Sequence, residues 1–115
     1  MTLMLGRNRG WMGGLVDNVQ IYQDSNGCYL LSGELSYSNV SQVYKKTANL
    51  FRKQKSNIEI DLSGVTHADS AGIALLVEWL SEARESNKAI HFVNVPQQML
   101  EMVRISSLDR VLPIS

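Results

Sequence analysis

The middle of the chain, residues 61–77, reads DLSGVTHADSAGIALLV. The residues that lead into it, 58–62, alternate apolar with acidic side chains, which is the pattern of a strand with one buried face. From about Ser70 to Ser86, apolar residues instead recur every three or four positions, as they do on the buried side of a helix. We therefore predict a strand over residues 58–62 that ends in a turn at Ser63-Gly64, then a loop, and then this helix.

The residues before this segment predict a hairpin followed by a helix. Val19, Ile21 and their neighbours have the pattern of a first strand, and residues 28–31 have that of a second. Asn26-Gly27 lies between them and suits a tight hairpin, because both residues tolerate a positive φ. After several serines that could cap a helix, apolar residues at helical spacing predict one from roughly Ser38 to Lys53.

The residues after the central helix predict one more strand and one more helix. Residues 89–93 place Ile90 and Phe92 on one face of a strand, and Pro96 suits the first turn of a third helix. Strands joined through a helix lie parallel, with right-handed crossovers. The fold class is therefore α/β: a mixed sheet of four strands, or five with a short edge strand from the N-terminal region, and three or more helices mainly on one face.

The first eighteen residues differ from the rest. They are rich in Gly and Met, and they lack the sustained apolar run of about 7 to 15 residues that an export signal needs. We predict a flexible N-terminal extension over residues 1–18 and a single domain over residues 19–115. Trp11, Met12, Leu15 and Val16 could contact a membrane or a partner, but an extension without a function is the commoner case, and we assign none.

Composition excludes several classes of function. Eleven Lys and Arg balance eleven Asp and Glu, so no net positive field attracts nucleic acid. The longest apolar run, from Ala71 to Val77, is far shorter than the roughly 20 residues of a membrane-spanning helix. Cys28 has no second cysteine to pair with, which indicates a buried, unreactive thiol in a reducing compartment. We expect a cytoplasmic protein that does not bind nucleic acid or span a membrane.

The predicted central helix has a wide apolar side and a narrow polar one. The narrow side should face outward, and it carries Ser70, Ala74, Glu78, Ser81 and Glu85. The start of a helix offers unpaired amides to a group that docks there, and Asp69 or Ser70 could also cap those amides. Local pattern alone leaves two interpretations open, a plain helix cap and a docking surface.

The motifs together resemble a known family. DSAGIALL at residues 69–76, with the strand 58–62 and DLSG at 61–64 before it, is similar to the signature of STAS domains. The likeness extends to Gly33-Glu34-Leu35 and to the ending at residues 107–113, so it covers roughly residues 19–113. The resemblance implies the STAS, or SpoIIAA-like, fold, which is shared by anti-sigma-factor antagonists and by an accessory subunit of the Mla phospholipid-transport ABC system.

The resemblance also implies where a partner binds. In the antagonists, the hydroxyl residue directly after the aspartate, here Ser70, is the phosphorylated one, so Ser70 is a candidate phosphorylation site. This chain departs from them at Ser36, where they carry an aspartate, and at Ala71, where they carry Ser or Thr. Both departures favour a constitutive binding surface, and the small residue at position 71 and the Ala-Leu-Leu run at residues 74–76 are similar to the Mla accessory subunits. We expect the partner-binding residues to be Asp69, Ser70, Ala71, Gly72, Ala74 and Glu78.

The function implied by this resemblance is that of a subunit without catalytic activity, cofactor or metal. It would bind the cytoplasmic ATPase of a phospholipid-transport ABC complex that maintains outer-membrane lipid asymmetry, and this complex would hold it at the inner membrane. The alternative is an anti-sigma-factor antagonist whose partner is an anti-sigma factor and serine kinase, switched by phosphorylation of Ser70. A STAS scaffold in some other complex is a third interpretation.

The residues from which an enzyme site could be built are few. A hydrolase would need a nucleophile, a base and an orienting group close together. We expect His67 in a loop and His91 on a strand, pointing away from Ile90 and Phe92, and no metal-binding spacing joins the two histidines. The remaining candidates are Asp61, Asp69, Ser70 and Cys28, and no phosphate-binding loop is present.

Overall fold

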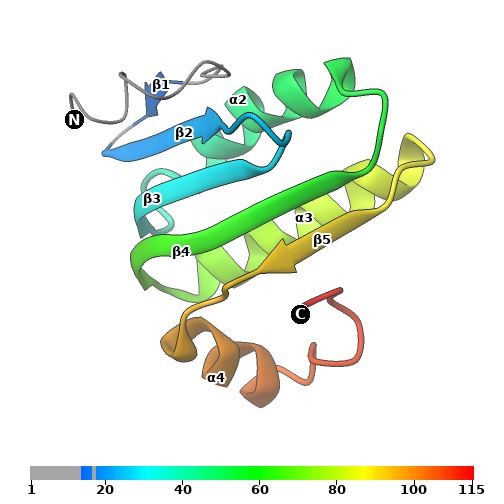
Figure 1. Ribbon diagram of the computed structural model, residues 1–115. Helices are drawn as coiled ribbons and strands as arrows, with labels where there is room; N and C mark the ends of the chain where they lie inside the picture. Colours follow the sequence, from blue (N-terminus) through cyan, green and yellow to red (C-terminus); the bar gives the residue numbers. More distant parts are fainter. Residues whose placement is uncertain (1–13, 17) are drawn as a thin grey trace.

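The computed structural model describes residues 14–16 and 18–115, and within them it contains one five-stranded sheet in the order β1-β2-β3-β4-β5 (Figure 1). Helices α2 and α3 lie side by side behind the sheet, and α4 lies beside its β5 edge. The predicted mixed sheet with helices mainly on one face is confirmed. In chain order the elements are β1 (Gly14–Val16), β2 (Val19–Gln23), β3 (Tyr29–Leu35), α2 (Val40–Lys53), β4 (Ile58–Ala68), α3 (Ser70–Glu85), β5 (Ile90–Val93) and α4 (Gln97–Ile105).

Strand directions follow from the connections. The hairpin pairs β2 antiparallel to β3, and the crossovers through α2 and α3 make β4 parallel to both β3 and β5. The hairpin loop contains Asn26-Gly27, but its bonded turn is centred on Ser25-Asn26, because the Gly27 amide donates to the Asp24 carbonyl at 3.1 Å. Of the two predicted residues, only Gly27 has a positive φ, of 89°. Asp24 holds the turn, because its Oδ1 accepts hydrogen bonds from the backbone amides of Asn26 at 2.8 Å and Cys28 at 3.0 Å.

The predicted turn at Ser63-Gly64 is wrong, because β4 runs on through this dipeptide to Ala68. At Gly64 the neighbouring strand comes so close that a Cβ would meet Ser32 Cβ at 2.6 Å. The pairing of β3 with β4 also shifts register here, between Leu30 and Ser32. Glycine therefore serves a close approach of two strands and not a turn. As a consequence, His67 lies in β4 and not in a loop.

The start of α2 also differs from the prediction. The helix begins at Val40, and none of the nearby serines caps it. Instead the buried Asn39 side chain holds the preceding loop: its Oδ1 accepts a hydrogen bond from the Ser36 amide at 3.0 Å, and its Nδ2 donates to the Glu34 carbonyl at 2.9 Å. This loop, residues 36–39, follows a β3 strand that is longer than predicted and includes Gly33-Glu34-Leu35.

The core lies between the sheet and the two helices behind it. Trp79 of α3 and Thr47 of α2 are both fully buried, and the indole Nε1 donates a 2.7 Å hydrogen bond to Thr47 Oγ1. The same hydroxyl donates to the Val43 carbonyl at 2.8 Å. Buried polar atoms are costly unless paired, so this contact fixes how α3 sits against α2.

The N-terminal region contributes an edge strand, as allowed for in the sequence analysis. Residues 14–16 form β1, which pairs antiparallel with β2. The flexible extension predicted for residues 1–18 otherwise concerns residues 1–13 and 17, including Trp11 and Met12, which lie outside the described residues. No helix within residues 14–16 and 18–115 is long and apolar enough to cross a membrane.

The predicted burial of Cys28 is confirmed. Burial, together with the negative charges of Glu59, Asp24 and Asp61, raises the pKa of its thiol to about 12. The thiol therefore stays protonated at neutral pH, and a protonated thiol is a poor nucleophile.

Candidate functional site

Asp69 caps the start of α3 and ties it to the loop before α2. Its Oδ1 accepts a hydrogen bond from the Ala71 amide at 2.9 Å, and its Oδ2 accepts one from the Tyr37 amide at 3.2 Å. Its own amide donates to the Leu35 carbonyl at 3.1 Å. Of the two residues that the sequence offered as caps, Asp69 is therefore the one that caps.

Ser70 is the first residue of α3, and its side chain is exposed. Because Asp69 satisfies the helix start, the Ser70 hydroxyl is not needed there. Within the part of the chain that the structure describes, this hydroxyl makes no hydrogen bond to another residue. It is available to an incoming group, whether a hydrogen-bonding partner or a phosphate.

Gly72 lies on the opposite, buried side of the same turn. A Cβ at this position would meet the Cβ atoms of Ala68 at 3.0 Å and Leu35 at 3.1 Å. The small residue thus lets α3 approach the ends of the chain's own strands. Any contribution of Gly72 to partner binding would be indirect, through the position of α3.

A shallow apolar groove of about 230 Å³ lies next to Ser70, between α2 and α3. Three of the predicted binding residues line it: the half-buried Ala71 and the exposed Ala74 and Glu78. All five residues of the predicted outward stripe on α3 are exposed. The remaining lining residues are Val40, Ser41, Tyr44 and Leu75.

Two aromatic residues at this site were not predicted from the sequence. Tyr37 is 75% exposed and sits in the loop that Asp69 holds. Tyr44 belongs to the apolar stripe of α2, and its place at the rim of a groove became visible only once α3 was positioned beside it. A lone tyrosine in a serine-rich loop carries no signal of its own, so Tyr37 could not have been found from the sequence.

Negative charge from α3 gathers along the groove. The Tyr44 hydroxyl donates a 2.9 Å hydrogen bond to Glu82 Oε1. Burial raises the pKa of Tyr44, and so do this hydrogen bond and the charges of Glu82, Glu78 and Glu85. These three carboxylates therefore all act on the α2 residue that borders the groove.

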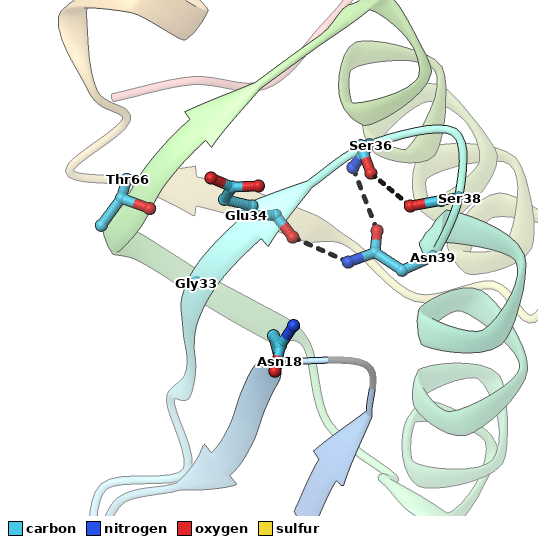
Figure 2. A pocket seen from close by; sticks show the side chains of 7 residues that line it. All are labelled: Asn18, Gly33, Glu34, Ser36, Ser38, Asn39 and Thr66. Carbon is cyan, nitrogen blue, oxygen red and sulfur yellow. Dashed lines mark hydrogen bonds between the residues drawn. The ribbon is translucent and has the colours of Figure 1, made fainter.

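A second cavity, polar and about 640 Å³ in volume, lies where β3 leads into the loop before α2 (Figure 2). Some of its polar groups bond to one another: the Asn39 side chain bonds to the backbone of Ser36 and Glu34, and the Ser36 and Ser38 hydroxyls lie 2.8 Å apart. Those bonds hold the loop in shape. It is lined by Asn18, Gly33, Glu34, Ser36, Ser38, Asn39 and Thr66.

The two histidines lie apart in the sheet, because His67 pairs with Glu34 of β3 and His91 pairs with Glu59 near the other end of β4. His67 and His91 are exposed on β4 and β5, and the His91 ring bonds to the Ser115 hydroxyl. Asp61 is partly buried, which opposes ionisation, but hydrogen bonds from Ser63 and Asn94 outweigh this and lower its pKa. Among residues 14–16 and 18–115, no three His, Cys, Asp or Glu side chains are arranged to hold a metal ion.

The chain is similar to known proteins in sequence and in structure. The family model described as "Mlab, STAS domain" matches residues 23–113. The intermembrane phospholipid transport system binding protein MlaB of Haemophilus influenzae is 32% identical over 82 residues, which cover 69% of this chain and 78% of the relative.

Solved structures with the same fold include members of two functional groups. A chain of the Acinetobacter MlaFEDB complex in an ATP-bound conformation matches with a TM-score of 0.69 and 29% identity, over 81% of this chain and 98% of that one. The unphosphorylated anti-sigma-factor antagonist SpoIIAA matches with a TM-score of 0.65 and 17% identity, over 84% of this chain and 87% of that one. The second likeness is one of fold alone.

Proposed function

The chain belongs to the Mlab family of STAS domains, as its motifs indicated, and on this premise we propose that it binds the cytoplasmic ATPase of a phospholipid-transport ABC complex. It acts there as a subunit without catalytic activity, and it supports the assembly or activity of a complex that maintains outer-membrane lipid asymmetry. The complex holds it at the cytoplasmic side of the inner membrane. The relatives in Haemophilus and Acinetobacter support this proposal.

The observation that carries the proposal is an exposed, unused hydroxyl beside an apolar groove. Ser70 is the first residue of α3, and its hydroxyl makes no hydrogen bond to any residue that the structure describes. The groove begins at the next residue, Ala71. Interface centres commonly combine an apolar depression with a few polar groups that are fully desolvated on binding. The exposed Tyr37 ring extends the same surface.

The direct test is co-purification with the ATPase subunit of the transport complex from the same organism. We expect Ser70→Arg to abolish capture, because a long charged side chain would have to be buried where a hydroxyl fits. Ser86→Arg places the same side chain at the exposed far end of α3, where a cation is favourable, and should leave capture intact. Failure of the wild-type chain to capture the ATPase would refute the proposal, and capture by both variants at the wild-type level would place Ser70 outside the interface.

A second candidate function rests on the same hydroxyl. Because Ser70 is exposed, a kinase could reach it, as the alternative of a phosphorylated anti-sigma-factor antagonist requires. At Ser36, however, the antagonists' aspartate is replaced by a hydroxyl that lies against Ser38. Intact-mass analysis after incubation with the organism's anti-sigma-factor kinases separates the two functions. A stoichiometric phosphate on Ser70 supports the switch, and an unmodified chain that captures the ATPase supports the transport subunit.

A further inference from the structure

The groove beside Ser70 has a negative border on one side and a positive border on the other. Resting on the proposed function, we infer that the segment of the ATPase seated in this groove is an amphipathic helix with oppositely charged edges. Its apolar side chains enter the groove, its cationic edge faces α3, and its acidic edge faces α2.

The negative border, which we call the acidic rim, consists of Glu78, Glu82 and Glu85. These residues are three or four positions apart and therefore lie on one side of α3. Glu78 lines the groove, and Glu82 accepts the hydrogen bond from Tyr44 across it. Arg84, the cation of α3, falls on a different side of the helix, since it is six residues from Glu78. The acidic rim is therefore not neutralised from within its own helix.

The positive border, which we call the basic rim, consists of Lys45 and Arg52. Lys45 is one turn beyond Ser41, which lines the groove, and Arg52 is two turns further on the same side of α2. Both are exposed, and α2 contains no acidic residue. Within the described residues, neither rim forms an ion pair with the other, so both keep their charge for a partner.

The size of the groove indicates what enters it. Its volume of about 230 Å³ is below the roughly 300–1,000 Å³ of typical small-molecule sites, and it suits one or two large apolar side chains. The walls are two helices and present no strand edge, so an extended peptide would gain no ladder of strand-like hydrogen bonds here. An amphipathic helix that presents apolar side chains at three- and four-residue spacing meets both conditions.

Measured affinity tests the charges of the occupant. With the purified ATPase as ligand, Glu78→Lys should weaken binding at least about tenfold, and Lys45→Glu by several fold, because each places like charges together. Glu78→Gln should weaken binding less, and its affinity should depend less on salt than that of the wild type. The matched controls are Glu101→Lys on α4 and Lys55→Glu after α2, which reverse exposed charges away from the groove.

Hydrogen–deuterium exchange of the ATPase, with and without this chain, identifies the segment that is covered. We expect protection of a helix with Lys or Arg on one edge and Asp or Glu on the other. If Ser70→Arg abolishes binding while Glu78→Lys and Lys45→Glu bind like the wild type, the inferred charges are wrong and the proposed function stands. A protected segment that is not such a helix also overturns the inference. If Ser70→Arg binds normally, Ser70 lies outside the interface and the inference about the groove beside it fails. If the wild-type chain does not bind the purified ATPase, the proposed function itself fails.

Discussion

Both carboxylate oxygens of Asp69 are engaged, one by the helix it caps and one by the loop that carries Tyr37. Asp69→Ala should therefore lower the free energy of unfolding by about 1–3 kcal/mol, since it removes a helix cap and a loop contact together. Asp69→Asn keeps an acceptor oxygen for the Ala71 amide and should lose less. Urea unfolding measures both, and equal losses for the two variants would contradict the assigned capping role.

Gly72 is a residue at which two effects oppose each other. Replacing a helical glycine by alanine normally stabilises a protein, by about 0.5–1 kcal/mol. Here the added Cβ would press on Ala68 and Leu35, which are both fully buried. We expect the clash to prevail, so that Gly72→Ala destabilises by about 1–3 kcal/mol. Thermal unfolding checks this. A rise in the melting temperature of Gly72→Ala would show that Ala68 and Leu35 move aside at little cost.

The exposure of single residues could be predicted where the spacing along one helix decides it. The outward stripe that begins at Ser70 follows from helical spacing alone, and it is exposed as predicted. The choice between Asp69 and Ser70 as the cap could not be made, because both residue types cap helices. Tyr37 owes its place to a contact with Asp69, 32 residues later in the chain, which no local pattern reveals.

At the scale of elements, the contact between α2 and α3 sets the shape of the groove. The hydrogen bond from Trp79 to Thr47 fixes the position of α3 against α2 in this contact. Trp79→Phe leaves a cavity and removes the indole donor, so we expect a loss of about 2–4 kcal/mol in the free energy of unfolding. Combining Trp79→Phe with Thr47→Val should cost less than the sum of the two single changes, because they break one shared bond. Strict additivity in urea unfolding would contradict this coupling.

The sequence predicted whether most segments are strands or helices, but it predicted their first and last residues less well. Alternation and helical spacing identified the strands β2 to β5 and the three helices. The error at Ser63-Gly64 arose because serine next to glycine commonly marks a turn, while the pairing of two distant strands decides otherwise. The start of α2 was misplaced for a similar reason, since the buried side chain of Asn39 orders the loop instead of a serine cap.

At the scale of the whole molecule, a net charge of zero conceals a strong separation of charge. Helix α2 carries four cations and no acid, whereas α3 carries three glutamates toward the groove between them. The order of elements could predict the fold, and the family resemblance could indicate the function. The groove itself could not be predicted, because it exists only where the two helices meet.

The proposed function requires that the partner meets this chain at the start of α3 and the groove beside it. Tyr37 replaced by the photoreactive p-benzoylphenylalanine tests it in living cells, with the same replacement at Ile105, the 83% exposed last residue of α4, as control. We predict a crosslink to the ATPase from position 37 and none from position 105. A crosslink from position 105 alone, or none from position 37 while the complex stays assembled, would place the interface elsewhere on the chain.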